Sequence, residues 1–458
     1  MADLKAGLYL NQPMELALLL GAVGAIIWMT TRLKMHPFLA LLLVSLGYGA
    51  GSGMALSDLL LAVQDGFGGT LGKIGLIIVL GIIIGSFLEH SGGAKAIAAR
   101  VLSWIGGGRV PLAMGVLGYV VSIPVFADSG FMLLDPLGKS LSRKARISLA
   151  GPAIALGLGL MASHTLVPPT PGPIAAAGIL GADLGLVLLF GVPVSLLALA
   201  VSVWFASRYA ARTPLDPGPE VALQGGPAPE TGTPGPGFFK ASLPIVVPIA
   251  LIVLKSAFGP APGGPTQGLQ TLVGFLGEPV IALLIGVFLS LLLPARLERQ
   301  MWSASGWVGK AIADSASILL ITGAGGIFGT VLQRSGLADS LGAVLVDYQI
   351  GIFLPFVLAA ALKTAQGSST VALITAASIL LPLMPSIGLE GEAQKALAVV
   401  ALGAGSSVIS HANDSFFWVV TQMSGMDVRT GYRLFGGGTF LLGTTAALAV
   451  FACSLLFT

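Results

Sequence analysis

The sequence predicts an all-α polytopic membrane protein with about ten transmembrane helices and two re-entrant hairpins, arranged as two inverted repeats. The first supporting observation is composition: of 458 residues, 55% are hydrophobic and only 9% are charged, and the mean hydropathy is +0.93. Soluble domains carry about a quarter charged residues. The second observation is that two distant segments each run from an apolar helix into a cluster of polar residues.

These two polar clusters follow similar helices rich in small residues. Residues 155–159 lead to a Ser-His pair and a proline-rich run within 163–173, and residues 401–405 lead to a second Ser-His pair within 410–415. No helix passes intact through consecutive prolines, because proline lacks an N–H and clashes with the preceding turn. In hydrocarbon such a break is tolerated only where it lines a cavity or is buried in protein. Paired breaks of this kind are typical of secondary transporters.

Apolar stretches long enough to span a bilayer define the expected transmembrane helices. They lie near residues 14–31, 38–56, 74–89, 147–180, 186–206, 240–258, 279–294, 315–333, 395–424 and 436–457. Two further apolar stretches, 110–142 and 350–386, have polar centres. Each of their arms, of about a dozen residues, rises roughly 18–20 Å, which is too short for a hydrocarbon core of ~30 Å. We therefore expect two re-entrant hairpins with polar tips near mid-membrane.

The basic residues predict the orientation. With the N-terminus outside, most of the 23 Lys and Arg residues fall in inner loops, as the positive-inside rule requires. They form no single stripe, which argues against a nucleic-acid partner. Ten spans then place both termini outside a cell inner (cytoplasmic) membrane. The single cysteine, Cys453, excludes a disulfide framework and a cysteine metal site.

A second internal match supports the division into halves. Residues 84–94 match residues 328–338 at an offset of 244, and the Ser-His pairs repeat at an offset of 247. Five spans per half is an odd number, so the halves are expected to be inverted, with the first hairpin opening inward and the second outward. The first repeat is assigned to residues 1–212 and the second to 240–458. A Pro/Gly-rich cytoplasmic linker over 213–239 joins them.

The two hairpin tips and two broken spans are expected to converge on one binding site. Helix N-termini that begin after such breaks present partial positive charge and free N–H groups, which suit a carboxylate. Hydroxyl and amide groups suit a polyhydroxylated ligand, so the combination indicates a small hydroxylated acid. The candidate substrate-binding residues are Ser129, His164, Thr165, Thr170, Lys363, Gln366, Gly367, Ser368, Ser369, Thr370, His411 and Asn413.

Several of these polar residues have a structural interpretation beside the functional one. Asp128 and Asp414 are intramembrane carboxylates, which are costly and usually functional, so they are the candidates for proton coupling; the alternative is an ion pair or a helix cap. Lys363 has three possible partners: the substrate carboxylate, Asp414 or the outer surface. Glu89 and His90 lie at a span end and are interpreted as solvated.

Six segments together resemble the gluconate permease (GntP) family of the ion transporter superfamily, and the resemblance covers nearly the whole chain. They are Gly-Phe-Gly-Gly-Thr-Leu-Gly at 66–72, Ser-Gly-Gly-Ala at 91–94, Asp-Ser-Gly-Phe at 128–131, Pro-Pro-Thr-Pro-Gly-Pro at 168–173, Gly-Ser-Ser-Thr-Val-Ala at 367–372 and Ser-His-Ala-Asn-Asp at 410–414. The resemblance implies proton-coupled import (symport) of gluconate or a related hydroxy acid. It also implies a homodimer in which a transport domain slides against a scaffold, as an elevator.

The sequence departs from the gluconate-transporting members of that family at two places. Those members tend to carry Glu-Val where Asp128-Ser129 stands and His where Thr170 stands. D-glycerate, D-serine and 3-hydroxybutyrate therefore stay open as substrates, and sodium stays open as the coupling ion. An anion channel is the alternative class of transport protein. An enzyme is disfavoured because the chain has no HExxH or GxSxG motif, and no cofactor is expected.

Overall fold

The computed structural model describes residues 2–106, 109–217, 235–259, 268–336 and 351–457, and the regular elements in these ranges are all helical. The principal helices of the first half are α1 (Ala2–Thr31), α2 (Pro37–Gly51), α3 (Leu56–His90), α4 (Gly93–Ile105), α5 (Val110–Ser122), α6 (Ala127–Ala145), α7 (Ala150–Leu166), α8 (Pro171–Leu180) and α9 (Leu184–Arg208). Those of the second half are α10 (Phe238–Phe258), α11 (Leu269–Leu276), α12 (Pro279–Ser290), α13 (Trp307–Arg334), α15 (Phe353–Gln366), α16 (Ser369–Leu380), α17 (Glu392–Ser406), α18 (Ser415–Ser424), α19 (Val428–Gly431) and α20 (Gly437–Ser454).

Both expected helix breaks are present. α7 ends at Leu166, and Pro171 opens α8 at a position where the missing N–H costs nothing. α17 ends at Ser406 and α18 begins at Ser415. The polar residues of the second break therefore lie outside regular helix.

Both apolar stretches with polar centres form helical pairs, α5–α6 and α15–α16, each joined by a turn of a few residues. The first turn is shorter than expected, because Asp128 and Ser129 lie in the first turn of α6. Their backbone amides therefore belong to a helix N-terminus. The second turn consists of Gly367 and Ser368.

Six helical segments in the described ranges are long and apolar enough to cross a membrane, or seven if the α11–α12 pair, bent by 69°, is one span. They are Leu56–His90, Ala150–Leu180, Leu184–Arg212, Phe238–Phe258, Arg299–Arg334 and Val428–Ser454. The protein is thus a multi-pass membrane protein, but the count of ten stays a prediction. The shortfall has a physical origin: α2 has only 15 residues, and a long break separates α17 from α18.

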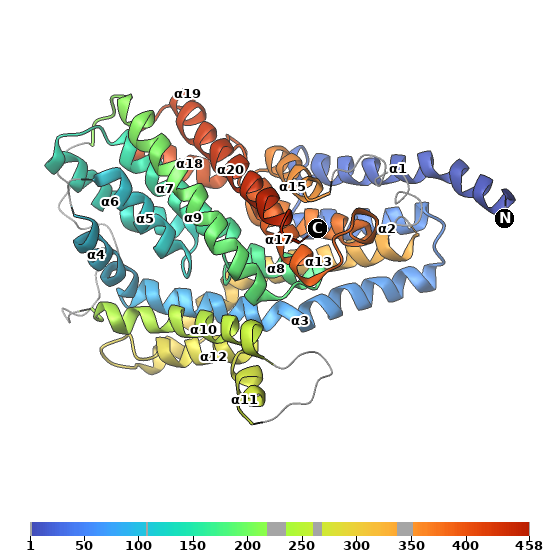
Figure 1. Cartoon of the computed structure of the whole chain (residues 1–458), viewed down its shortest axis with the longest axis horizontal. Coiled ribbons are helices and arrows are strands. Elements are labelled where there is room, and N and C mark those ends of the chain that lie inside the picture. The colour runs from blue at the N-terminus through green and yellow to red at the C-terminus, as the bar shows by residue number, and fades with distance from the viewer. Residues whose placement is uncertain (1, 107–108, 218–234, 260–267, 337–350, 458) are drawn as a thin grey trace.

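α3 and α13 pack against each other along much of their length, and Figure 1 shows α3 running across the molecule below α7 and α9. Two glycines allow the close approach: a Cβ added to Gly66 would lie 2.6 Å from the Gly326 carbonyl oxygen. This contact explains why α3 has 35 residues, beginning at Leu56, although its apolar stretch begins near residue 74. Tertiary packing keeps the glycine-rich first half helical.

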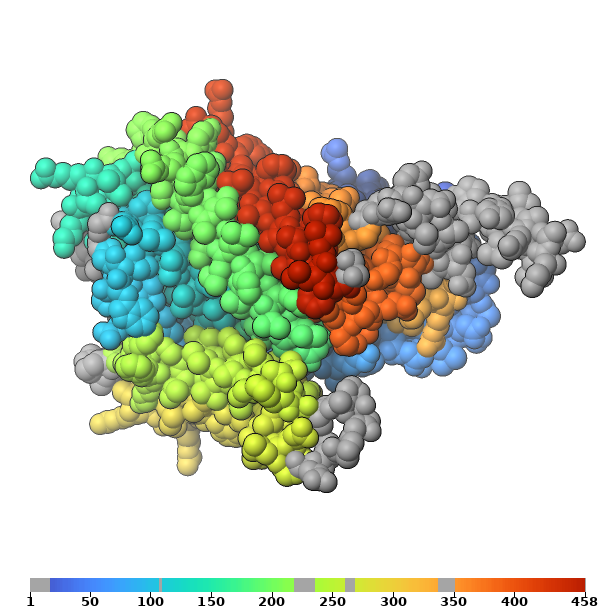
Figure 2. Space-filling view, viewed as in Figure 1, coloured from blue at the N-terminus to red at the C-terminus, as the bar shows by residue number. Residues whose placement is uncertain are grey.

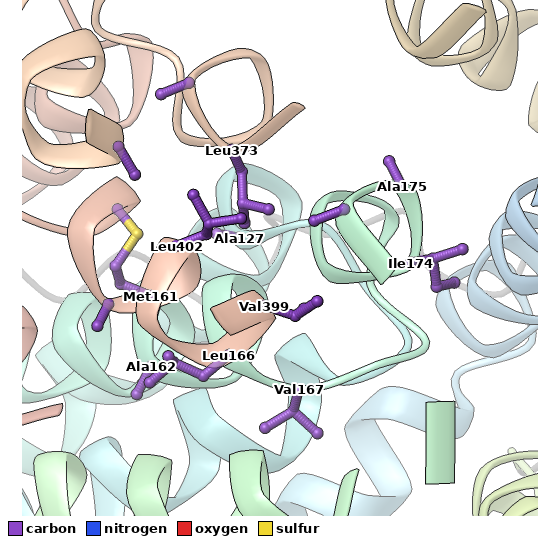
Figure 3. Packing of buried hydrophobic residues seen from close by; sticks show 14 of the residues in the cluster. Ala127, Met161, Ala162, Leu166, Val167, Ile174, Ala175, Leu373, Val399 and Leu402 are labelled. Atoms are coloured by element: carbon purple, nitrogen blue, oxygen red, sulfur yellow. The ribbon is translucent and has the colours of Figure 1, made fainter. Parts of the chain in front are cut away.

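The remaining helices surround the two broken spans. α9 and α20 lie side by side across the face in Figure 2, and α10 and α12 form a pair that packs on α3. Figure 3 shows the core beside the breaks, where α7, α8, α16 and α17 contribute Met161, Leu166, Ile174, Leu373, Val399 and Leu402 to one buried cluster. This core fixes the half-helices relative to one another.

The offset of 244 recurs in the positions of helix ends. α3 ends at His90 and α13 at Arg334, while α8 spans Pro171–Leu180 and α18 spans Ser415–Ser424. The Ser-His pairs, matched at 247, are not equivalent. His164 lies in the last turn of α7, whereas His411 lies five residues beyond the end of α17. That part of the sequence match was wrong, because the second break is longer than the first.

Candidate functional site

Three helix N-termini surround an inner cavity of about 130 Å³. They are the first turns of α6, α16 and α18, and α7 closes the remaining side. The lining residues are Phe126, Ala127, Asp128, Met161, His164, Ser368, Ser369, Thr370, Asp414, Ser415 and Phe416. The first N–H groups of a helix have no carbonyl partner within it, and the helix dipole favours negative charge there. None of the lining residues is Lys or Arg, and the nearest buried cation is Lys363, which pairs with the lining residue Asp414.

A larger cavity of about 480 Å³ adjoins the inner one. Phe126, Asp128, His164 and Thr170 line both. The larger cavity lies between the first hairpin tip, the α7–α8 break and the α3–α13 pair. Its outer part is lined by Glu89, His90, Lys310 and Asp314, of which Lys310 and Asp314 are exposed. It therefore connects the inner cavity to charged residues at one end of α3 and α13.

Several buried polar atoms at these cavities have no hydrogen-bond partner among the residues that the structure describes. Among them are Asp128 Oδ1, His164 Nδ1 and the Ser122 hydroxyl. Buried polar groups almost always have a hydrogen-bond partner, so an unpaired one beside a cavity indicates a place for a ligand or water. Asp128 and His164 are the two such residues that line both cavities.

The Asp414 carboxylate differs from that of Asp128 because both of its oxygens have partners within the protein. Its Oδ2 lies 2.6 Å from Lys363 Nζ and also accepts the Ser410 hydroxyl, and its Oδ1 accepts the Phe416 N–H at 3.0 Å. Lys363 is fully buried and also donates to the Gly367 carbonyl. Asp414 is thus both an N-cap of α18 and the partner in a buried ion pair. Both alternatives considered for it are present.

Two further predicted residues fasten the second break to the end of α15. His411 Nε2 lies 2.7 Å from the Thr364 carbonyl oxygen. Asn413 Nδ2 donates to the carbonyls of Thr364 and Ala365 at 2.9 and 3.0 Å. These contacts satisfy carbonyls that a helix C-terminus leaves without partners.

The predicted site residues therefore divide into three groups. Those that line a cavity are Asp128, Ser129, His164, Thr170, Ser368, Ser369, Thr370 and Asp414. Those that hold the second tip to the second break are Lys363, Gly367, His411 and Asn413. Thr165 and Gln366 line neither cavity: the Thr165 hydroxyl donates to Met161 of its own helix, and the Gln366 side-chain amide is buried without a partner.

Sequence reasoning missed two groups of lining residues. Met161 and Phe416 line the inner cavity, and their positions beside His164 and Asp414 could have suggested them, whereas Ser415, which also lines it, belongs to the polar residues expected at the second break. The α3 and α13 residues of the larger cavity carried no such signal. Glu89 and His90 were interpreted as a solvated span end, but they line that cavity because α13 packs beside them: His90 stacks on Trp307 with ring centroids 5.4 Å apart.

Comparison with known proteins assigns the family. The family model described as GntP family permease matches residues 14–456. The protein belongs to the GntP family of permeases. A gluconate permease of Pseudomonas aeruginosa is 35% identical over 94% of this chain and 96% of its own length. The D-serine transporter DsdX of Escherichia coli K12 is 33% identical over 95% of this chain and 97% of its own.

Two solved structures share the fold of this GntP permease. The YdaH transporter of Alcanivorax borkumensis has a TM-score of 0.68 at 14% identity, covering 92% of this chain and 99% of its own. MtrF of Neisseria gonorrhoeae has a TM-score of 0.66 at 15% identity, covering 93% of this chain and 96% of its own. The chain is therefore a membrane transporter and not an enzyme, and its family transports small acids.

Proposed function

We propose that this permease carries out proton-coupled uptake of gluconate or a related small hydroxy acid across the cytoplasmic membrane. The observation that carries the proposal is the convergence of three helix N-termini on a cavity lined by hydroxyl groups, an unpartnered carboxylate and a histidine. Relatives named for gluconate and for D-serine support a small substrate that bears a carboxylate.

The substrate carboxylate is assigned to the N-terminus of α16. Ser369 and Thr370 supply hydroxyl groups there, and their N–H groups are among those that a helix leaves unpaired. Among the described residues, the Ser369 hydroxyl has only the Met161 thioether as an acceptor, at 3.8 Å. A carboxylate would be a far stronger acceptor than that sulfur. The hydroxylated part of the substrate then extends toward His164 and Ser129.

The coupling proton is assigned to Asp128. The negative charge of Asp414 is balanced by Lys363, whereas Asp128 Oδ1 has no partner and lines both cavities. An ionised Asp128 would repel a substrate carboxylate, so its protonation favours substrate binding. This antagonism couples the two events.

The movement is assigned to an elevator of inverted repeats in a homodimer. The larger cavity lies beside the contact between the first hairpin tip and α3, where a Cβ added to Gly85 would clash with the Pro124 carbonyl oxygen; sliding of the hairpins and broken helices against α3 and α13 would change access from this cavity to Asp128. The reciprocal packing of α6 on α18 and of α16 on α8 supports a pseudo-two-fold relation. Both termini are assigned to the outside, as the distribution of basic residues predicts.

Counterflow tests the substrate class. Proteoliposomes loaded with unlabelled gluconate are diluted into radiolabelled gluconate with competing D-serine, D-glycerate, 3-hydroxybutyrate or sorbitol. Acids are expected to compete, and the strongest competitor identifies the preferred substrate. Sorbitol is the uncharged control. Competition by sorbitol as strong as that by gluconate would show that no carboxylate site exists.

A further inference from the structure

Lys363 is a fully buried ammonium group at the point where three chain segments meet. Its Nζ donates to Asp414 Oδ2 in the second break, at 2.6 Å, and to the Gly367 carbonyl in the hairpin turn. The Ser410 hydroxyl donates to the same carboxylate oxygen. The Lys363 ammonium thus donates to one carbonyl and one carboxylate oxygen, and the Ser410 hydroxyl shares that carboxylate oxygen.

The surroundings of Lys363 are those of a cation site. Burying a charge is very costly unless it is paired and hydrogen-bonded. Here the charge also lies in the last turn of α15, where the helix dipole favours a cation. Carboxylate and backbone carbonyl oxygens are also the ligands that hard metal cations take in proteins.

The packing around Gly367 shows that this junction is tight. Gly367 has a φ of +89°, and an added Cβ would lie 2.1 Å from the Asn413 carbonyl oxygen. The second hairpin turn is therefore held directly against the second break. By contrast, Asp128 Oδ1 at the first tip has no hydrogen-bond partner in the described part of the chain.

We propose that the Lys363 ammonium is a permanent, covalently tethered cation that occupies the place of an exchangeable metal ion between the second hairpin and the second break. It does not touch the substrate; it is a positioning residue that holds the N-termini of α16 and α18 at the inner cavity. This inference extends the proposed function. Only the role of Lys363 in transport depends on that function. With this position filled, Asp128 is left as the exchangeable cation site, which takes a proton.

Removal of the side chain should create a site for a free cation. Lys363→Ala leaves the oxygen cluster and a cavity of the length of the side chain, whereas Lys363→Met removes the charge but fills the space. The purified variants are heated in detergent with methylammonium chloride, sodium chloride or N-methyl-D-glucamine chloride at equal ionic strength. Methylammonium and sodium are the small probe cations, and N-methyl-D-glucamine is the bulky control cation.

The expected result is a lower midpoint of unfolding for both variants, with methylammonium or sodium raising it for Lys363→Ala alone. Lys363→Met/Asp414→Asn, in which both charges are gone, should unfold at a higher temperature than Lys363→Met. The proposal is overturned if Lys363→Ala responds to these cations no more than Lys363→Met, or if sodium shifts the wild-type midpoint equally. If Lys363→Ala does not fold, a double variant no more stable than Lys363→Met is the contradicting result.

These measurements contain no substrate. An error in the assigned transport function would leave the cation response of Lys363→Ala intact, whereas an error in the role of Lys363 would abolish that response and leave wild-type counterflow unchanged. The two failures are therefore distinguishable.

Discussion

Asp128 differs from Asp414 in its partners, and that difference carries the coupling assignment. The Asp128→Asn variant cannot release or take up a proton, so it should lose uptake driven by a pH gradient and keep part of its substrate exchange. Uptake and counterflow in the same proteoliposomes measure the two activities. Asp128→Glu, which restores the carboxylate, is the matched control. Gradient-driven accumulation by Asp128→Asn at the wild-type level would exclude Asp128 as the proton carrier.

The Ser369 hydroxyl is the predicted donor to the substrate carboxylate. Its loss in Ser369→Ala should weaken substrate binding by about 1.5–3 kcal/mol, the range for a hydrogen bond to a charged group. Calorimetric titration or ligand-induced thermal shift measures the change. Ser378→Ala on the same helix is the matched control, since the Ser378 hydroxyl donates to the Ile374 carbonyl and is remote from the cavity. Equal losses for the two variants would remove Ser369 from the site.

At the scale of residues, the sequence predicted which types of side chain lie at the site better than it predicted the partner or role of each one. Asp128 and His164 could be found because polar groups at helix breaks in hydrocarbon need a reason to be there. The pairing of Lys363 with Asp414 was one of several options, because residues 51 positions apart are brought together only by packing of α15 on α17. The Thr165 hydroxyl donates to a carbonyl of its own helix and lines neither cavity, so its contact with the substrate stays a prediction.

The contact between α3 and α13 depends on the absence of a side chain at Gly66. In Gly66→Ala the new Cβ would lie 2.6 Å from a carbonyl oxygen and 2.7 Å from the Ile327 Cα, so the helices must separate. Overpacking of this kind costs about 1–3 kcal/mol of stability. Thermal unfolding in detergent should show the loss. Gly68→Ala on the same helix meets nothing within 4 Å and should be neutral or slightly stabilising.

An equal effect of Gly66→Ala and Gly68→Ala would contradict the described packing of the two helices.

At the scale of elements, hydrophobic length and proline predicted most of the helices and both breaks. The first half of α3 escaped prediction because its glycines and polar residues are poor signals for a helix and become favourable only against α13. The count of ten transmembrane helices stays a prediction for a related reason. α2 is too short to cross the hydrocarbon core by itself, and the sequence does not show which neighbouring helices pack against it.

The inverted arrangement of the whole molecule predicts opposite accessibility for two positions. Ser140 lies on α6 and Ser386 follows the corresponding arm of the second hairpin. Single cysteines at these positions, in a protein whose Cys453 is replaced by Ser, should react with a membrane-impermeant maleimide from opposite sides. Labelling in intact cells and in inverted vesicles measures this. Reaction of both cysteines from the same side would contradict the inverted repeat.

The coupling of substrate movement to protons is the central claim, and gradient-driven uptake tests it most directly. Radiolabelled gluconate, or the acid preferred in counterflow, is offered to wild-type proteoliposomes with an inward pH gradient, an inward sodium gradient or neither. We predict accumulation above the outside concentration only with the pH gradient, and its collapse when a protonophore is added. Accumulation driven by sodium at equal pH, or mere equilibration under the pH gradient, would contradict the account.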